Sequence, residues 1–203
     1  MRLQRVLGAV VGIVLALSFL VLLLAFRSVV VPLTAIAMNL LSVGAAYGLL
    51  VLVFQEGVGA GLLGFQQVDV IEAWIPLFLF AVLFGLSMDY HVFLLSRIRE
   101  RWLETGDTPG AIRHGIASSA RLISGAALIM VAVFGGFAMG EMVMFQQMGF
   151  GLAVAVLLDA TIVRSILVPA TMRILGDRNW WFPGALAFLP RIDVEGTSAG
   201  IAD

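Results

Sequence analysis

The chain contains no cysteine and no lysine, and only 12% of its 203 residues are charged. The absence of cysteine excludes disulfides, thiolate metal sites and thiol chemistry. The formal net charge of −1 leaves no basic field for nucleic acid, so we expect no nucleic-acid partner. Hydrophobic residues make up 61% of the sequence, well above their share in a soluble domain. Lipid is therefore the expected solvent of this chain.

Five apolar stretches are long enough to cross a bilayer, since a transmembrane helix needs about 20 mainly apolar residues. They lack the period-two alternation of membrane β-barrel strands. We predict an all-α integral membrane protein with a transmembrane domain over residues 1–176 and a partly disordered cytoplasmic tail over residues 177–203. The predicted helices cover residues 7–26, 33–54, 75–95, 122–139 and 148–172.

Arginines lie unequally on the two sides of these helices. Cytoplasmic loops of multi-pass proteins hold the excess of positive charge, which places the N-terminus outside and the C-terminus in the cytoplasm. The polar segment 97–121 is then an interfacial segment on the cytoplasmic surface. Arg2 and Arg5 run against this orientation, because a basic start usually stays inside. The cytoplasmic arginines are Arg27, Arg97, Arg99, Arg101, Arg113, Arg121, Arg173, Arg178 and Arg191.

Asp89 is an ionisable residue inside a predicted span. It lies six residues before Leu95, the last apolar residue of that span, or roughly 9 Å inside the helix end. Ionisable residues within spans usually face a bundle interior or a wet cavity and mark functional sites. We therefore predict that Asp89 accepts protons and that Tyr90, about 100° around the helix, reaches toward a second helix. A buried carboxylate that serves only in packing is the alternative.

Small residues precede the two carboxylates that lie within spans, Asp89 and Asp159, by one or two helical turns. Small side chains on one helix face allow a neighbouring helix to approach closely. We therefore expect close helix packing beside each carboxylate. The predicted packing residues are Gly85 before Asp89, and Gly151 and Ala155 before Asp159.

Asp159 and Arg164 share the last predicted helix. Five residues correspond to about 140° around an α-helix, which argues against a direct pair between the two side chains. Arg164 can instead pair with another helix or extend toward the inner surface. We treat Asp159, Arg164 and Ser96 as supporting polar residues whose roles are either structural or functional.

His91 follows Tyr90 and could carry protons or bind a metal. No second histidine, cysteine or carboxylate stands at ligand spacing around it. We therefore expect no metal site and no cofactor.

The stretch FGLSMDYHVFLLSRIRE, residues 84–100, resembles the tenth membrane helix of the MMPL family of resistance-nodulation-division transporters. Three further stretches resemble that family in the same order. Residues 20–48 are similar to helices eight and nine, residues 123–138 to helix eleven, and residues 149–181 to helix twelve with its exit. The resemblance covers nearly the whole chain, so the five predicted spans resemble helices eight to twelve of such a transporter.

This resemblance implies a secondary active transporter, not an enzyme, that exports lipids or hydrophobic compounds and is driven by the proton-motive force across a bacterial-type inner membrane. Asp89 and Tyr90 match the proton-relay pair of its second half. The implied partners are the lipid bilayer, a lipid or hydrophobic substrate, and an N-terminal half with an outer domain. Arg2 and Arg5 then lie on the return from that outer domain. The chain is a gene fragment or a subunit of a split transporter on this interpretation.

Two other functions are open to such a sequence. A membrane scaffold or accessory subunit would use its buried polar groups only to specify helix packing. An intramembrane aspartyl protease would use two carboxylates on separate helices to activate water. Against the protease, Asp159 lacks the preceding GxGD pattern, and Asp89 precedes its tyrosine where the proteases have tyrosine first.

Overall fold

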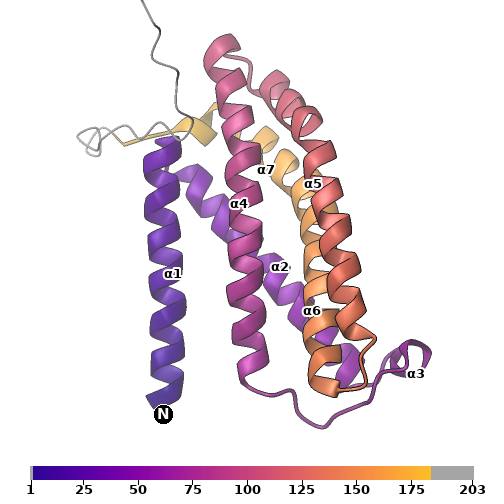
Figure 1. Cartoon of the computed structure of the whole chain (residues 1–203). Helices are drawn as coiled ribbons and strands as arrows, with labels where there is room; N and C mark the ends of the chain where they lie inside the picture. The colour runs from indigo at the N-terminus through magenta and orange to yellow at the C-terminus, as the bar shows by residue number, and fades with distance from the viewer. Residues whose placement is uncertain (1, 184–203) are drawn as a thin grey trace, which may run out of the picture.

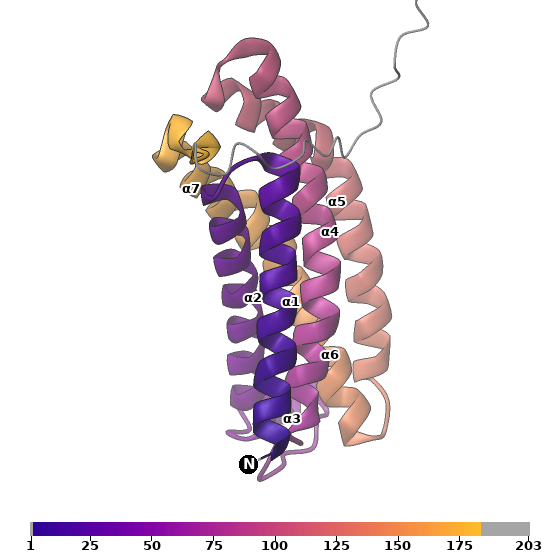
Figure 2. The same ribbon diagram turned by 90° about the vertical axis from the view of Figure 1, so that its left-hand side faces the viewer.

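The computed structural model describes residues 2–183, with side chains from residue 8 onward. These residues form helices and connecting loops, without a strand. Five helical spans lie side by side as a bundle (Figure 1, Figure 2), and each is long and apolar enough to cross a membrane. The predicted all-α membrane fold with five spans is confirmed. The spans are α1 (Arg2–Phe26), α2 (Val30–Phe54), α4 (Trp74–Thr105), α5 (Thr108–Ala138) and a composite last span that begins with α6 (Val143–Leu158).

The last span changes its helix type along its length. α6 continues into the π-helix η1 (Asp159–Leu167), then α7 (Val168–Leu175) and the 3-10 turn η2 (Gly176–Trp180). The N–H of Val168 bonds the carbonyl of Val163 five residues earlier, which is the π-helical pattern. Pro169 lies in the first turn of α7 and has no N–H to donate. The regular α-helical ladder therefore cannot run unbroken from η1 into α7.

The arginine-rich stretch 97–121 continues the two spans that flank it. α4 ends at Gly106, whose φ of +65° is the left-handed conformation common at helix C-termini. Two Arg–Glu salt bridges, each between residues three positions apart, support the added turns of α4. The structure therefore has a helical hairpin where we expected a separate interfacial segment. The pairs are Arg97–Glu100 at 3.1 Å and Arg101–Glu104 at 2.8 Å.

The two ends of the bundle differ in the segments that they contain. The arginine-rich end holds the α1–α2 link, the α4–α5 hairpin and η2, and the opposite end holds the start of α1 and the short helix α3 (Ala60–Leu63) (Figure 1). At the arginine-rich end the buried Ser28 hydroxyl donates to the Asn179 carbonyl at 2.5 Å. Trp102 stacks on Trp180 with ring centroids 4.8 Å apart. These contacts hold η2 against the α1–α2 link and α4.

α5 and α6 approach each other closely at Gly149. A Cβ at this position would lie 2.4 Å from the Ala138 nitrogen and 2.5 Å from the Phe134 carbonyl oxygen. Both are backbone atoms, so neither can rotate away as a side chain could. The glycine therefore sets the distance between the two helices.

We expect Gly149→Ala to lower the free energy of unfolding by about 1–3 kcal/mol, because an added methyl group must push two backbones apart. Thermal unfolding of the purified protein in detergent measures this change. Gly125→Ala is the matched control, since Gly125 is exposed on α5 and nothing lies within 4 Å of its added Cβ. Equal melting temperatures for the two variants would contradict the proposed close approach.

Candidate functional site

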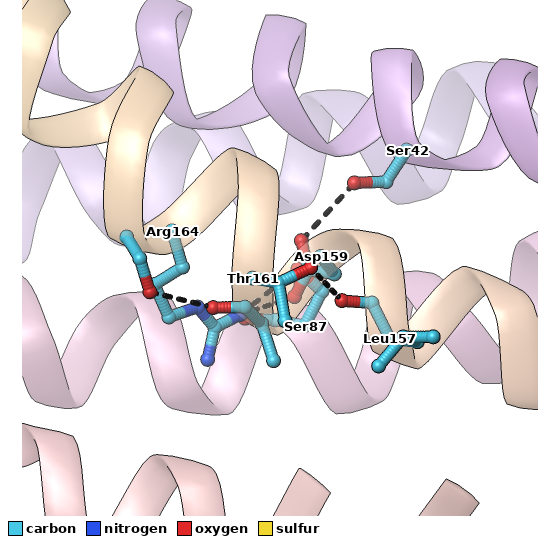
Figure 3. Close-up of polar contacts among 8 residues, drawn as sticks. Ser42, Ser87, Leu157, Asp159, Thr161 and Arg164 are labelled. Atoms are coloured by element: carbon cyan, nitrogen blue, oxygen red, sulfur yellow. Dashed lines mark hydrogen bonds and ion pairs between the residues drawn. The ribbon is translucent and has the colours of Figure 1, made fainter.

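The carboxylate of Asp159 is the centre of a polar cluster inside the bundle (Figure 3). Its side chain is buried at the start of η1. Oδ1 accepts a hydrogen bond from the Ser42 hydroxyl of α2 at 3.2 Å, and Oδ2 accepts one from the Ser87 hydroxyl of α4 at 3.0 Å. Two neighbouring helices thus supply the hydrogen bonds that water would otherwise give this carboxylate.

Arg164 completes the cluster from the same helix as Asp159. Its Nη2 lies 2.6 Å from Asp159 Oδ2 and also donates to the Ser87 carbonyl at 3.1 Å. Our expectation that the geometry disfavours a direct pair between these two residues is wrong. It assumed an α-helix, whereas η1 is a π-helix, in which residues five apart lie about one turn above each other.

Hydrogen bonds from neighbouring groups support the ion pair of Asp159 and Arg164. Removing two charges from water costs several kcal/mol per ion, and their attraction offsets this only with good geometry and further hydrogen bonds. Both carboxylate oxygens are bonded, and Arg164 Nη2 has three acceptors within 3.3 Å. Arg164 Nε is a buried atom of this cluster that has no hydrogen-bond partner among the described residues.

Tyr90 links this cluster to the next polar group on α4. The Arg164 guanidinium carbon lies 5.2 Å from the centroid of the Tyr90 ring, within cation–π distance. Asp89, the neighbour of Tyr90, is exposed and points to a different face of α4. Tyr90 therefore faces the buried pair, while Asp89 faces away from it.

Asp89 lines a groove between α1 and α4. The groove has a volume of about 440 Å³, and Val10, Val14 and Phe84 contribute to its apolar wall. Gly85 also lines it, and nothing lies within 4 Å of a Cβ built there. Among the described side chains Asp89 has no hydrogen bond or ion pair. The two carboxylates considered in the sequence are thus in separate environments, one satisfied and one open.

The other predicted site residues lie in different surroundings. Gly151 is buried, and a Cβ there would lie 2.9 Å from Leu50 Cδ1. Ala155 is fully buried one turn later, next to Asp159. Ser96 is half-buried two turns beyond Asp89, and no hydrogen bond joins it to either carboxylate. The small residues of α6 thus contact their neighbours, whereas Gly85 does not.

Ser42 and Ser87 are the site residues that sequence reasoning missed. Single serines within apolar runs are common and cheap to bury when they bond their own backbone, so they give little signal. His91 is also buried, one turn after Ser87 on α4. Within the described residues no group of three or more potential ligands could hold a metal ion.

We expect Arg164→Leu to lower the free energy of unfolding by about 3–5 kcal/mol, because it leaves the Asp159 carboxylate buried without its partner. The Asp159→Leu, Arg164→Leu double variant should recover much of that loss, since no uncompensated charge remains. Thermal unfolding in detergent measures both changes. Arg173→Leu is the control, because Arg173 is an exposed arginine of α7. A double variant no more stable than Arg164→Leu alone would contradict the pairing.

Comparison with protein families gives a match over most of this chain. The family model described as "MMPL family" matches residues 3–191. This range includes all five spans, the Asp159 cluster and the groove at Asp89.

Several curated proteins are similar to the chain. The heme uptake protein MmpL11 of Mycobacterium tuberculosis is 49% identical over 183 residues, which cover 90% of this chain and 19% of the relative. The mycolic acid-containing lipids exporter MmpL11 of Mycolicibacterium smegmatis is 48% identical, over 88% of this chain and 19% of the relative. The trehalose monomycolate exporter MmpL3 of the same organism is 44% identical, over 84% of this chain and 17% of the relative. The chain therefore spans less than a fifth of the length of these relatives.

Proposed function

The chain belongs to the MMPL family, and we propose that it forms part of the membrane domain of a proton-driven exporter of lipids or other hydrophobic compounds. It is a multi-pass membrane protein with transporter relatives. Proton coupling, cargo and orientation are the parts that this proposal adds. The observation that carries it is the arrangement around Tyr90 of α4: the open carboxylate of Asp89 is its neighbour in sequence, and the buried ion pair of η1 lies against its ring.

Asp89 is the group that takes up the proton in this proposal. A carboxylate in a wet groove is charged at little cost, whereas the same carboxylate against a dry helix is costly to keep charged. Contact between the groove at Asp89 and a further helix therefore favours the protonated form. Conversely, the charged form favours an open groove. A change of protonation is thereby coupled to a change of helix packing.

Tyr90 carries this change toward the bundle interior. Its ring lies under the Arg164 guanidinium, and its neighbour Asp89 faces the groove. A negative charge that appears or disappears at Asp89 thus acts on the charges of η1 across one side chain. Coulomb interactions of this kind are strong where water is excluded.

We place the arginine-rich end in the cytoplasm, because positive charge gathers on that side of membrane proteins. The α1–α2 link with Arg27, the end of α4 with Arg97 and η2 with Arg178 all lie at this end of the bundle (Figure 1). The start of α1 then lies on the outer side. The names of the relatives, which mention mycolic acid-containing lipids and heme, support a bulky hydrophobic cargo.

In the complete transporter, Asp89→Asn should reduce gradient-driven export to the rate seen without a gradient, because the amide cannot take up the proton. Export of a lipid cargo from cells or proteoliposomes, with and without a proton gradient, measures this loss. Asp107→Asn is the matched control, since Asp107 is an exposed carboxylate in the α4–α5 hairpin.

Assembly separates a proton-relay role from a scaffold role in the same experiment. A relay variant should reach the membrane in normal amount and melt at the wild-type temperature, yet fail to export. Undiminished export by Asp89→Asn would refute the relay. Loss of assembly together with export would instead favour the scaffold.

Tyr90→Phe should retain the stability of the protein and weaken its proton-coupled export. The phenylalanine ring preserves the aromatic contact with Arg164, whereas the hydroxyl that could pass a proton is lost. Thermal unfolding and export, measured on the same preparation, separate these effects. A variant that exports at the wild-type rate would restrict the role of Tyr90 to its ring.

A further inference from the structure

His91 is a buried titratable residue for which the proposed cycle has no use. It lies one turn after Ser87 on α4 and is 2% exposed. Its ring hydrogen-bonds the Ser87 backbone, and Nε2 has no hydrogen-bond partner among the described residues. The ring bond to a carbonyl places a proton on Nδ1, so Nε2 is the basic nitrogen of the neutral ring. A buried basic nitrogen without a donor is costly to keep.

His91 also lines a small cavity between α2, α4 and α7. The cavity offers about 10 Å³ to a water-sized sphere, close to the space that one water molecule needs. Thr34 of α2 and Thr171 of α7 contribute their side chains to its wall. The Thr34 hydroxyl lies 3.0 Å from the carbonyls of both Val30 and Val31, which share its single proton, so its oxygen can accept a further hydrogen bond.

The charges around His91 come from one side only. Arg164 and Asp159 of η1 both act electrostatically on it, and Arg164 donates to the same Ser87 carbonyl that the histidine contacts. The residues of α2 and α7 that line the cavity are uncharged. On its own helix the nearest titratable residues are Asp89 and Tyr90. His91 thus connects the buried ion pair to an uncharged, water-sized space.

We propose that His91 and one water molecule in this cavity form a proton-binding site on the arginine-rich side of the Asp159–Arg164 pair. A hydronium ion that reaches the cavity transfers its proton to Nε2, a water molecule remains, and the imidazolium holds the positive charge. The return of the proton to that water reverses the step. The transport role of this site rests on the proposed function, whereas proton binding at Nε2 does not.

Spectroscopy tests proton binding itself. In the intact transporter in lipid, NMR of isotope-labelled histidine should show a His91 signal that changes with the pH of the solution, with His91→Gln as the reference spectrum for assignment. Thr34→Val with Thr171→Val should suppress or shift this change, because two hydroxyls beside the water are removed at nearly constant volume. A His91 signal that is independent of pH, or unaffected by the valines, would overturn the site.

Transport tests the use of the site. At a fixed gradient, the export rate should depend on the pH at the arginine-rich side. His91→Gln should remove one titration step from this pH profile, while export continues at the pH where the rate is highest. His114→Gln is the control, because His114 is exposed on the hairpin. A His91→Gln profile identical to wild type would refute the role in transport. If His91→Gln fails to assemble, the pH profile of the Thr34→Val, Thr171→Val double variant tests the role of the site in transport instead.

The two experiments distinguish failure of this site from failure of the proposed function. Wild-type export that ignores the proton gradient would refute the proposed function, and the NMR titration would still decide whether His91 binds a proton. If export is gradient-driven but the His91 NMR signal does not change with pH, the proposed function stands and the proton-binding site at His91 is refuted.

Discussion

The buried ion pair between Asp159 and Arg164 determines how the last span is built and how its neighbours pack. A carboxylate and a guanidinium within an apolar bundle are tolerated only when each finds its hydrogen bonds inside the protein. The π-helical turn brings the two side chains to one face. Ser42 and Ser87 then bond the carboxylate from α2 and α4, so three spans are held at one point. Ala155, fully buried one turn earlier, leaves room for this approach.

The π-helix is also the reason that the two charges pair with each other within one span. In an α-helix Arg164 would point away from Asp159, and each charge would need a counter-charge on another helix. The local change of helix type removes that need at the cost of a less regular hydrogen-bond ladder. Pro169 in the first turn of α7 marks where the regular ladder is already interrupted. A helix irregularity and a charge pair therefore compensate for each other.

The sequence predicts the all-α fold with five spans, and the site only in part. Span positions follow from the number of consecutive apolar residues, which the bilayer thickness fixes. The helix ends do not follow from the number of apolar residues, because α4 continues into polar sequence, where Arg–Glu pairs support it, and ends only at Gly106. The pairing of Asp159 with Arg164 was missed because helix type is not encoded in hydropathy. The role of Ser87 was missed because its hydrogen bond to Asp159 depends on which helix packs against α4, and the sequence does not show this.

The environment of each polar group indicates which groups hold the fold and which can change. Asp159 is surrounded by donors, so removing or adding a proton there would break several bonds at once. Asp89 and the Nε2 of His91 have no partners among the described residues, so a proton can reach or leave them without that loss. They line different hollows beside α4, and Tyr90 and Ser87 respectively connect them to Arg164. In the proposed cycle the satisfied pair is thus the fixed element, and the two unsatisfied groups are where protons bind.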